Sequence, residues 1–144
     1  MKKLIMVIMA AFAFFSCESS NPKLVEFSQL PANAQSIIKT HFANKVILTI
    51  LYENDMFDKD YEVRFEDGSK IDFDGNGEWT NIEVKKNGGV PVGVIPSAIN
   101  SYVSSKHPNH YVIDIEKDCR EYNVELNNGI DMVFGKDGNF KRYD

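Results

Sequence analysis

One sequence pattern in this chain has a clear chemical meaning, and it lies between residues 72 and 83. The letters DFDGNGEWTNIE match the calcium-loop pattern D-x-[DN]-x-[DN]-G-x₅-E at every specified position. In an EF-hand, oxygen ligands at loop positions 1, 3 and 5 and a bidentate glutamate at position 12 hold calcium, while a glycine at position 6 makes the sharp turn. A calcium site here would use four side chains: Asp72, Asp74, Asn76 and Glu83.

The residues on both sides of this pattern favour a different structure, a β-hairpin turn. An EF-hand loop joins two helices, whereas apolar and polar residues alternate on both sides of this turn, as they do in strands. A related segment, residues 134–140, keeps the glycine and the aromatic residue but has Lys136 among the ligand positions. The pattern is therefore either a calcium loop or a hairpin turn whose carboxylates are solvated.

The other reactive residue types form no catalytic pattern. His107 and His110 could begin a zinc site, but no cysteine or second histidine pair completes four ligands. No serine lies in a G-x-S-x-G motif, and the acidic residues are dispersed along the chain. Cys119 is interpreted as a small apolar filler in a strand, not as a nucleophile. We therefore expect no enzymatic activity and, outside the calcium alternative, no cofactor.

Two aromatic residues are candidates for a binding role. Trp79 and Phe140 each follow a glycine-containing turn of the predicted strands. Large aromatic side chains in such places either pack beneath helices or stand on an uncovered sheet face, where they anchor contacts with another protein. Both alternatives are open for this pair.

The N-terminus has the layout of a signal peptide for export. Lys2 and Lys3 precede the apolar residues 4–15, and no acidic residue occurs before Glu18. A membrane-spanning helix needs about 20 apolar residues, so this run is too short to span a bilayer.

Two cleavage sites fit this layout. Cleavage would follow the small residues at 11–13, or fall directly before Cys17, whose thiol would then carry lipid. We favour the second site because Ser16 is small and a polar segment follows, although Phe14 stands where such signals usually have leucine. An acylated Cys17 tethers a protein to a membrane without spanning it. We therefore predict an exported protein, periplasmic or anchored as an outer-membrane lipoprotein, with a signal peptide at 1–16, a tether at 17–26 and a domain at 27–144.

The charge balance excludes some classes of partner. The chain has 16 basic and 21 acidic residues, and loss of Lys2 and Lys3 with the signal peptide leaves 14 basic residues, so the net charge changes from −5 to −7. An acidic chain without a cluster of Lys and Arg lacks the positively charged surface that binds nucleic acid or anionic lipid. We expect an unidentified protein of the cell envelope as the partner.

The predicted domain contains one unit twice. Residues 30–38 (LPANAQSII) match residues 95–103 (IPSAINSYV) at an offset of 65. Both segments have a proline that suits the first turn of a helix, followed by apolar residues with helical spacing. Alternating strand patterns follow at 61–65 and 122–126, now at an offset of 61, so the first unit has four extra residues. We place these residues in a longer loop at 54–58.

The two units are predicted to build a single α+β domain. The repeats cover residues 27–86 and 92–144, and the segment between them is too short and too apolar for a flexible linker. Each repeat supplies a helix and then antiparallel strands. The helices would pack on one face of an antiparallel sheet and leave the other face exposed.

The helix start at 30–42, the strand 61–65 and the segment 73–79 resemble the β-lactamase-inhibitor-like, PepSY-like proteins of Bacteroides-type bacteria. The resemblance implies a tandem α+β fold similar to that of the β-lactamase inhibitor protein, with helices beside a curved antiparallel sheet. That inhibitor binds its enzyme with the concave face of its sheet, and PepSY modules are regarded as restraining peptidases. Because fold does not fix function, no binding residue is transferred.

Two functions from different classes follow as expectations. The first is a non-enzymatic envelope module that binds another protein, as an inhibitor or regulator of a peptidase or another envelope enzyme. The second is a calcium-binding structural or sensing protein that uses the loop at residues 72–83.

Overall fold

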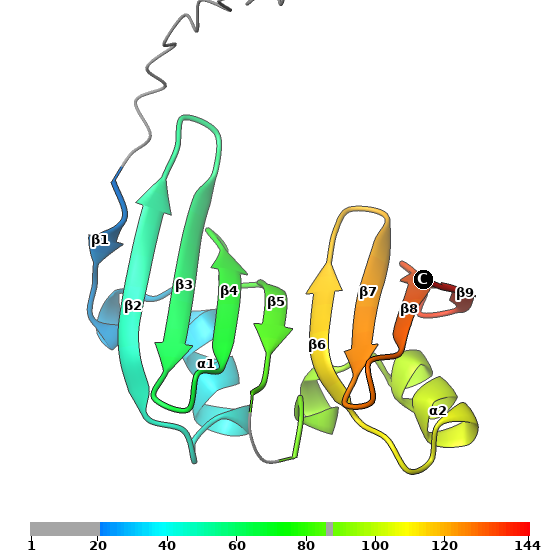
Figure 1. Cartoon of the computed structure of the whole chain (residues 1–144). Coiled ribbons are helices and arrows are strands. Elements are labelled where there is room, and N and C mark those ends of the chain that lie inside the picture. The colour runs from blue at the N-terminus through cyan, green and yellow to red at the C-terminus, as the bar shows by residue number, and fades with distance from the viewer. Residues whose placement is uncertain (1–20, 86–87) are drawn as a thin grey trace, which may run out of the picture.

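One antiparallel sheet of nine strands forms the frame of the fold, and each strand pairs with the next one in the sequence. The computed structural model describes residues 21–85 and 88–144, which also contain two α-helices and two short 3₁₀ helices (Figure 1). The strands are β1 (Lys23–Leu24), β2 (Ile47–Asn54), β3 (Lys59–Phe65), β4 (Lys70–Asp74), β5 (Trp79–Glu83), β6 (Val112–Lys117), β7 (Glu121–Leu126), β8 (Asp131–Gly135) and β9 (Phe140–Tyr143). The helices are η1 (Phe27–Gln29), α1 (Ala32–His41), η2 (Val92–Val94) and α2 (Ser97–Lys106). The predicted α+β class with an antiparallel sheet is confirmed.

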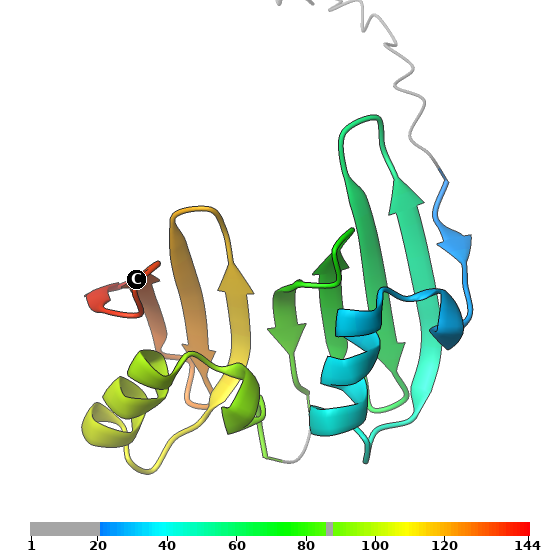
Figure 2. The same ribbon diagram turned by 180° about the vertical axis from the view of Figure 1, so that it is seen from behind.

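Both α-helices lie on the same side of the sheet (Figure 2). Along the chain, α1 is followed by β2 to β5, and α2 is followed by β6 to β9. Strands β5 and β6 join the two halves through three cross-strand pairs, with Ile82 opposite Ile115 at the centre. The two halves therefore share one continuous sheet.

Each α-helix begins directly after a proline. Pro31 and Pro96 have φ values of −53° and −51°, and a proline is tolerated at the start of a helix because no intrahelical bond needs its missing N–H. Each helix then buries two residues four positions apart: Ala34 and Ile38 in α1, Ile99 and Val103 in α2. This spacing places one apolar stripe of each helix toward the sheet.

The hydrophobic core lies between the helices and the sheet. The rings of Phe42, after α1, and Phe65, in β3, stack with their centroids 5.9 Å apart. In the second half, Tyr102 of α2 meets Phe134 of β8 edge to face at 5.4 Å. Buried residues from both halves belong to one cluster, so the core is as continuous as the sheet.

Two glycines allow the hairpin turns to touch the helix starts. Gly77, between β4 and β5, has a φ of +80°, and a Cβ atom on it would lie 2.8 Å from the Cβ atom of Pro31. Gly138, between β8 and β9, has a φ of +81°, and its Cβ atom would lie 2.8 Å from that of Ala98. Neither the backbone conformation nor the space accepts a side chain at these positions. The glycine at position 6 of the calcium pattern, Gly77, thus has a packing role.

The β2–β3 hairpin is longer than the β6–β7 hairpin, but the turns at the ends of the two hairpins have the same length. The pair Tyr52–Tyr61 corresponds in register to Lys117–Tyr122. Beyond it, the first hairpin adds two further cross-strand pairs before a turn of four residues, 55–58. The longer loop that we predicted at 54–58 is therefore wrong. The four extra residues lengthen the two strands instead.

The N-terminal predictions lie partly outside the described residues. The signal peptide at 1–16 and Cys17 are outside them, so export and lipidation stay predictions. Lys23 and Leu24, which we assigned to the tether, pair with β2 as strand β1, so the sheet begins before residue 27. Within the described residues, no helix is long and apolar enough to cross a membrane.

Candidate functional site

The sheet face that points away from the helices carries a line of carboxylates, which we call the acidic row. It consists of Glu83 in β5, Asp114 in β6, Glu125 in β7 and Asp131 in β8. Each member is the direct cross-strand partner of the next. The neighbouring row, which starts with the pair Ile82–Ile115, is buried under the helices. Because side chains alternate across a strand, the acidic row points to the open face.

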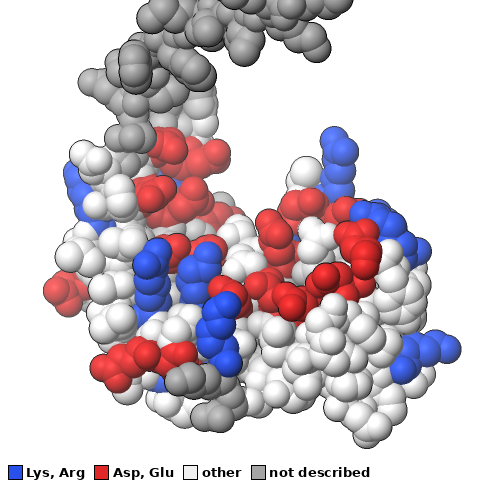
Figure 3. All heavy atoms as spheres, viewed as in Figure 1, with Lys and Arg blue, Asp and Glu red and all other residues white. Residues whose placement is uncertain are grey.

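Three members of the acidic row, Asp114, Glu125 and Asp131, line a hollow on the half of the face that β5 to β8 form. Figure 3 shows acidic side chains gathered across this half, whereas Lys and Arg gather over β3 and β4. The hollow has a volume of about 220 Å³. The carboxylates that line it are Asp114, Glu116, Glu125, Asp131 and Asp144.

Two contacts offset part of the charge at the end of the row nearest β5. Lys85 forms an ion pair with Glu83, and Asn81 Nδ2 donates a hydrogen bond of 3.1 Å to Asp114 Oδ1. Like charges directly opposite each other in neighbouring strands destabilise a sheet. The row therefore reduces the stability of the fold that contains it.

The pKa of Asp114 shows the direction in which its neighbours act. Burial raises the pKa of its carboxyl above the usual 3.8, the hydrogen bond from Asn81 lowers it, and the neighbouring Glu83, Glu125 and Glu116 raise it again, with a net upward shift. A positive group placed over the row would remove this repulsion and bring the pKa back down. The row is chemically suited to bind Lys or Arg side chains.

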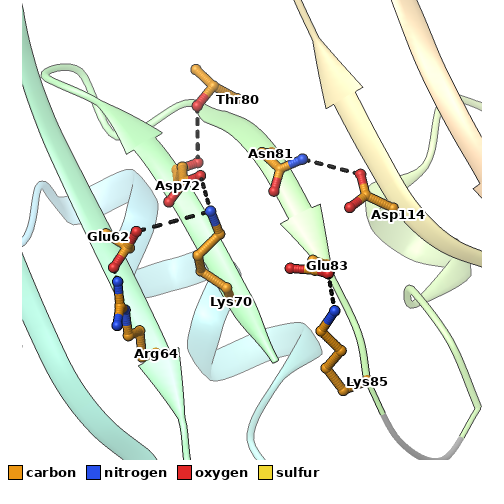
Figure 4. A network of polar contacts seen from close by, with 9 residues as sticks. All are labelled: Glu62, Arg64, Lys70, Asp72, Thr80, Asn81, Glu83, Lys85 and Asp114. Atoms are coloured by element: carbon orange, nitrogen blue, oxygen red, sulfur yellow. Dashed lines mark hydrogen bonds and ion pairs between the residues drawn. The ribbon is translucent and has the colours of Figure 1, made fainter. Parts of the chain in front are cut away.

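Part of the other half of the open face, over β3 and β4, has a different electrostatic pattern, in which cations and carboxylates alternate. Arg64 pairs with Glu62, and Lys70 lies 3.0 Å from Asp72 and 3.9 Å from Glu62 (Figure 4). Burial raises the pKa of the Asp72 carboxyl, and the contact with Lys70 opposes this rise. Here the protein supplies its own countercharges.

The structure separates the four residues of the calcium pattern into three places. Asp74 Oδ1 accepts the backbone N–H groups of Asn76 and Glu78 at 2.9 and 3.0 Å, as in a capped hairpin turn. Asp72 lies on the open face beside Lys70, as described above. Glu83 is the cross-strand partner of Lys70, at the opposite end of the β4–β5 hairpin from the turn. Among the described residues, no group of three or more His, Cys, Asp or Glu side chains is arranged to hold a metal ion.

The two aromatic candidates lie on the helix-covered side of the sheet. A β-bulge between Asp72 and Phe73 makes Trp79 the partner of the fully buried Phe73. Trp79 is only 8% exposed, and Lys117 Nζ lies 5.0 Å from its ring centroid. Phe140 stacks on Tyr102 of α2 with centroids 4.5 Å apart. In the structure, both side chains therefore pack on the helix side of the sheet and do not stand on its open face.

The remaining reactive residues do not meet. His107 Nε2 lies 3.2 Å from the Tyr143 hydroxyl, while His110 Nδ1 lies 3.3 Å from Asn127 Oδ1. Cys119, which we predicted as a filler in a strand, is exposed instead. Its segment bends into the β6–β7 turn because Asp118 Oδ1 accepts the N–H groups of Arg120 and Glu121.

The acidic row was not predicted from the sequence. Its members are spread over 49 residues, from position 83 to position 131, and each lies in a different strand. The signal that could have found them is the register: once four neighbouring strands are aligned, one row is entirely acidic. Sequence patterning gives the alternation but not that alignment.

A family model matches most of the chain. It is described as "Putative beta-lactamase-inhibitor-like, PepSY-like", and it matches residues 17–62 and 59–142. No curated protein matches the chain significantly.

Three crystal structures of Bacteroides proteins are similar to the chain over nearly their whole length. A "putative periplasmic protein" from Bacteroides vulgatus is 38% identical, with a TM-score of 0.82 over 87% of this chain and 98% of that one. A "putative calcium-regulated periplasmic protein" from Bacteroides thetaiotaomicron is 36% identical, with a TM-score of 0.80 over 85% and 96%. Another "putative periplasmic protein of unknown function" from Bacteroides vulgatus is 30% identical, with a TM-score of 0.77 over 85% and 98%.

Proposed function

The chain belongs to the β-lactamase-inhibitor-like, PepSY-like family, and from this premise we propose that it is a non-enzymatic module of the cell envelope that binds another protein. The observation that carries the proposal is the acidic row on the open sheet face. The row lowers stability and buries no apolar surface, so folding alone does not explain it. A partner with a basic surface would neutralise it.

The chemistry of the row defines the class of partner. Complementary charges across an interface speed the encounter and exclude partners of the wrong sign, and their effect weakens as salt is added. A basic surface on a peptidase or another envelope enzyme fits this face. Binding there would make the protein an inhibitor or regulator of that enzyme.

A charge-reversal experiment tests this proposal. The mature chain is used to capture proteins from an envelope extract, at low and at high salt, and Glu125→Lys is compared with Glu66→Lys. Both variants change the charge by the same amount, but Glu66 is an exposed residue in the turn after β3, outside the acidic row. We expect E125K to lose the salt-sensitive partner and E66K to retain it. Equal capture by both variants would show that the row is not the binding site.

The structural relatives and the N-terminal pattern support a proposal for the location of the protein. The three structural relatives named above are described as periplasmic proteins, and the N-terminal pattern of this chain fits export. We propose a lipid anchor on Cys17. Labelling with radioactive palmitate in cells tests this, because the wild-type chain should take up label and Cys17→Ser should not.

We also infer that the two halves arose as repeats of one unit. The order of one helix and four strands is the same in both, and Gly77 and Gly138 make the same kind of contact with the start of their helix. This inference does not depend on the binding proposal.

A calcium-dependent role is the second candidate function. It is supported by the relative from Bacteroides thetaiotaomicron, whose name describes calcium regulation, and by the carboxylates at the β4–β5 turn. Isothermal titration of the mature chain with calcium chloride tests it, with Asp74→Asn and Glu83→Gln as variants. If the turn binds calcium through the described arrangement, D74N should abolish the heat and E83Q should retain it. The absence of heat at millimolar calcium would eliminate this function.

A further inference from the structure

The tip of the β2–β3 hairpin presents two large apolar side chains to solvent. Met56 is 94% exposed and Phe57 is 93% exposed. Single apolar residues are common on protein surfaces, but two adjacent ones at the end of a hairpin form a protruding apolar surface. They are the most exposed large hydrophobic residues in the described part of the chain.

The turn itself does not require these residues. Asp55 donates its N–H to the carbonyl oxygen of Asp58 at 2.9 Å, which closes the turn. The β6–β7 hairpin closes in the same way, with 3.1 Å between Asp118 N and Glu121 O. The two central residues there are Cys119 and Arg120. Because the same closing hydrogen bond forms around a cysteine and an arginine, this bond does not account for Met56 and Phe57.

The length of the hairpin makes the tip accessible. Beyond the Tyr52–Tyr61 pair, two additional cross-strand pairs extend the ladder. At about 3.4 Å per residue, they carry the tip roughly 7 Å further out than the corresponding turn of the second half. Figure 1 shows the β2–β3 hairpin reaching beyond all other strands.

Acidic residues surround the base of the tip. Four carboxylates and one cation lie between positions 53 and 60: Glu53, Asp55, Asp58, Asp60 and Lys59. Burial raises the pKa of the Asp60 carboxyl, and Asp58, Asp55, Asp72 and Asp74 raise it further. Apolar segments that enter a membrane usually have Lys or Arg beside them, because bilayer surfaces are negative. The charges beside this tip therefore favour a protein partner with positive groups.

We propose that Met56 and Phe57 are an apolar anchor that enters an apolar pocket with a basic rim on the partner protein. The proposal rests on the proposed function and adds a second contact site on the same molecule. The acidic row would then supply charge complementarity, and the tip would supply buried apolar area.

Photo-crosslinking in cells tests the anchor directly. The photoreactive residue p-benzoylphenylalanine replaces Phe57 in one variant and Val92 in a control variant, since Val92 is also apolar and 71% exposed. We expect position 57 to crosslink to the protein that wild type captures in a salt-sensitive manner, and position 92 not to do so. Crosslinks from position 57 to lipid alone would overturn the proposal. So would binding of the mature chain to vesicles of phosphatidylethanolamine and phosphatidylglycerol that is lost in Phe57→Ser.

An affinity measurement separates this proposal from the proposed function. The variant M56S/F57R gives the tip the polar character of the β6–β7 turn, and circular dichroism should show an unchanged fold. Loss of two buried apolar side chains should weaken binding to the crosslinked partner by about 30-fold or more. If M56S/F57R binds like wild type while E125K does not, the anchor is refuted and the proposed function stands. If both variants bind like wild type, both proposals fail.

Discussion

Gly77 lies so close to the first turn of α1 that a Cβ atom on it would be 2.8 Å from the Cβ atom of Pro31 and 2.9 Å from the backbone nitrogen of Ala34. Asn33 strengthens the contact, because its Nδ2 atom donates a hydrogen bond of 3.2 Å to the carbonyl oxygen of Gly77. The turn and the helix are thus fixed to each other. This contact explains the glycine of the calcium-like pattern without any metal.

Replacement of Gly77 by alanine should destabilise the protein more than the same change at Gly129. Both glycines have positive φ, +80° and +82°, so both variants carry the backbone strain of about 1–2 kcal/mol. Nothing lies within 4 Å of a Cβ atom at Gly129, whereas Gly77 has no room. Urea unfolding should give a further loss of about 1–3 kcal/mol for G77A, as is typical of overpacked sites. Equal losses for the two variants would contradict the close contact.

Trp79→Ala should reduce stability by about 3–5 kcal/mol, because it deletes a buried aromatic side chain. The control is Phe57→Ala, which should change the unfolding free energy by less than about 0.5 kcal/mol because that ring is 93% exposed. Thermal or urea unfolding of both variants measures the difference. A W79A protein with wild-type stability and impaired binding would instead support a direct binding role for this residue.

The burial of Asp114 and the carboxylates around it should make stability depend on pH in a defined direction. The folded-state pKa of this carboxyl is raised, so the folded protein binds the proton more readily than the unfolded chain does. Its contribution to stability therefore increases as the pH falls from 7 through the raised pKa, and decreases as the pH rises. In urea unfolding, Asp114→Asn should be more stable than wild type at pH 7, by up to about 1 kcal/mol. This advantage should shrink as the pH is lowered, and a constant advantage would refute the assignment.

Asp67 should show the opposite dependence. Burial alone would raise the pKa of its carboxyl, but hydrogen bonds from Lys45 and Ser69 outweigh burial and lower the pKa from 3.8 to about 2. The stabilisation is present above pH 3.8 and is lost as the pH falls toward 2. Asp67→Asn should reduce stability at pH 7 by about 1 kcal/mol, and wild type and variant should converge in acid. Parallel acid-unfolding curves for the two proteins would contradict this prediction.

The sequence predicts the elements of this fold better than their alignment. Pro31 and Pro96 mark the helix starts, and alternation predicts strands such as 61–65, because these signals act over a few neighbouring residues. The orientation of Trp79 was undetermined because a bulge of one residue decides which face a side chain takes. The same limit applies to the open face, where the acidic row exists only once four strands are in register. The tip at Met56 was also missed, because local sequence does not show how far two strands stay paired.

The regular spacing of the sheet gives the acidic row a further property. Neighbouring strands lie about 4.8 Å apart, so its four carboxylates follow one another at nearly equal intervals. Residues three and four positions apart on a helix are separated by about 5–6 Å, whereas side chains on one face of an extended peptide are about 6.8 Å apart. We expect the positive charges of a basic helix to match the spacing of these carboxylates more closely than those of an extended basic peptide. The face would then select its partner by the spacing of positive charges and not by their number alone.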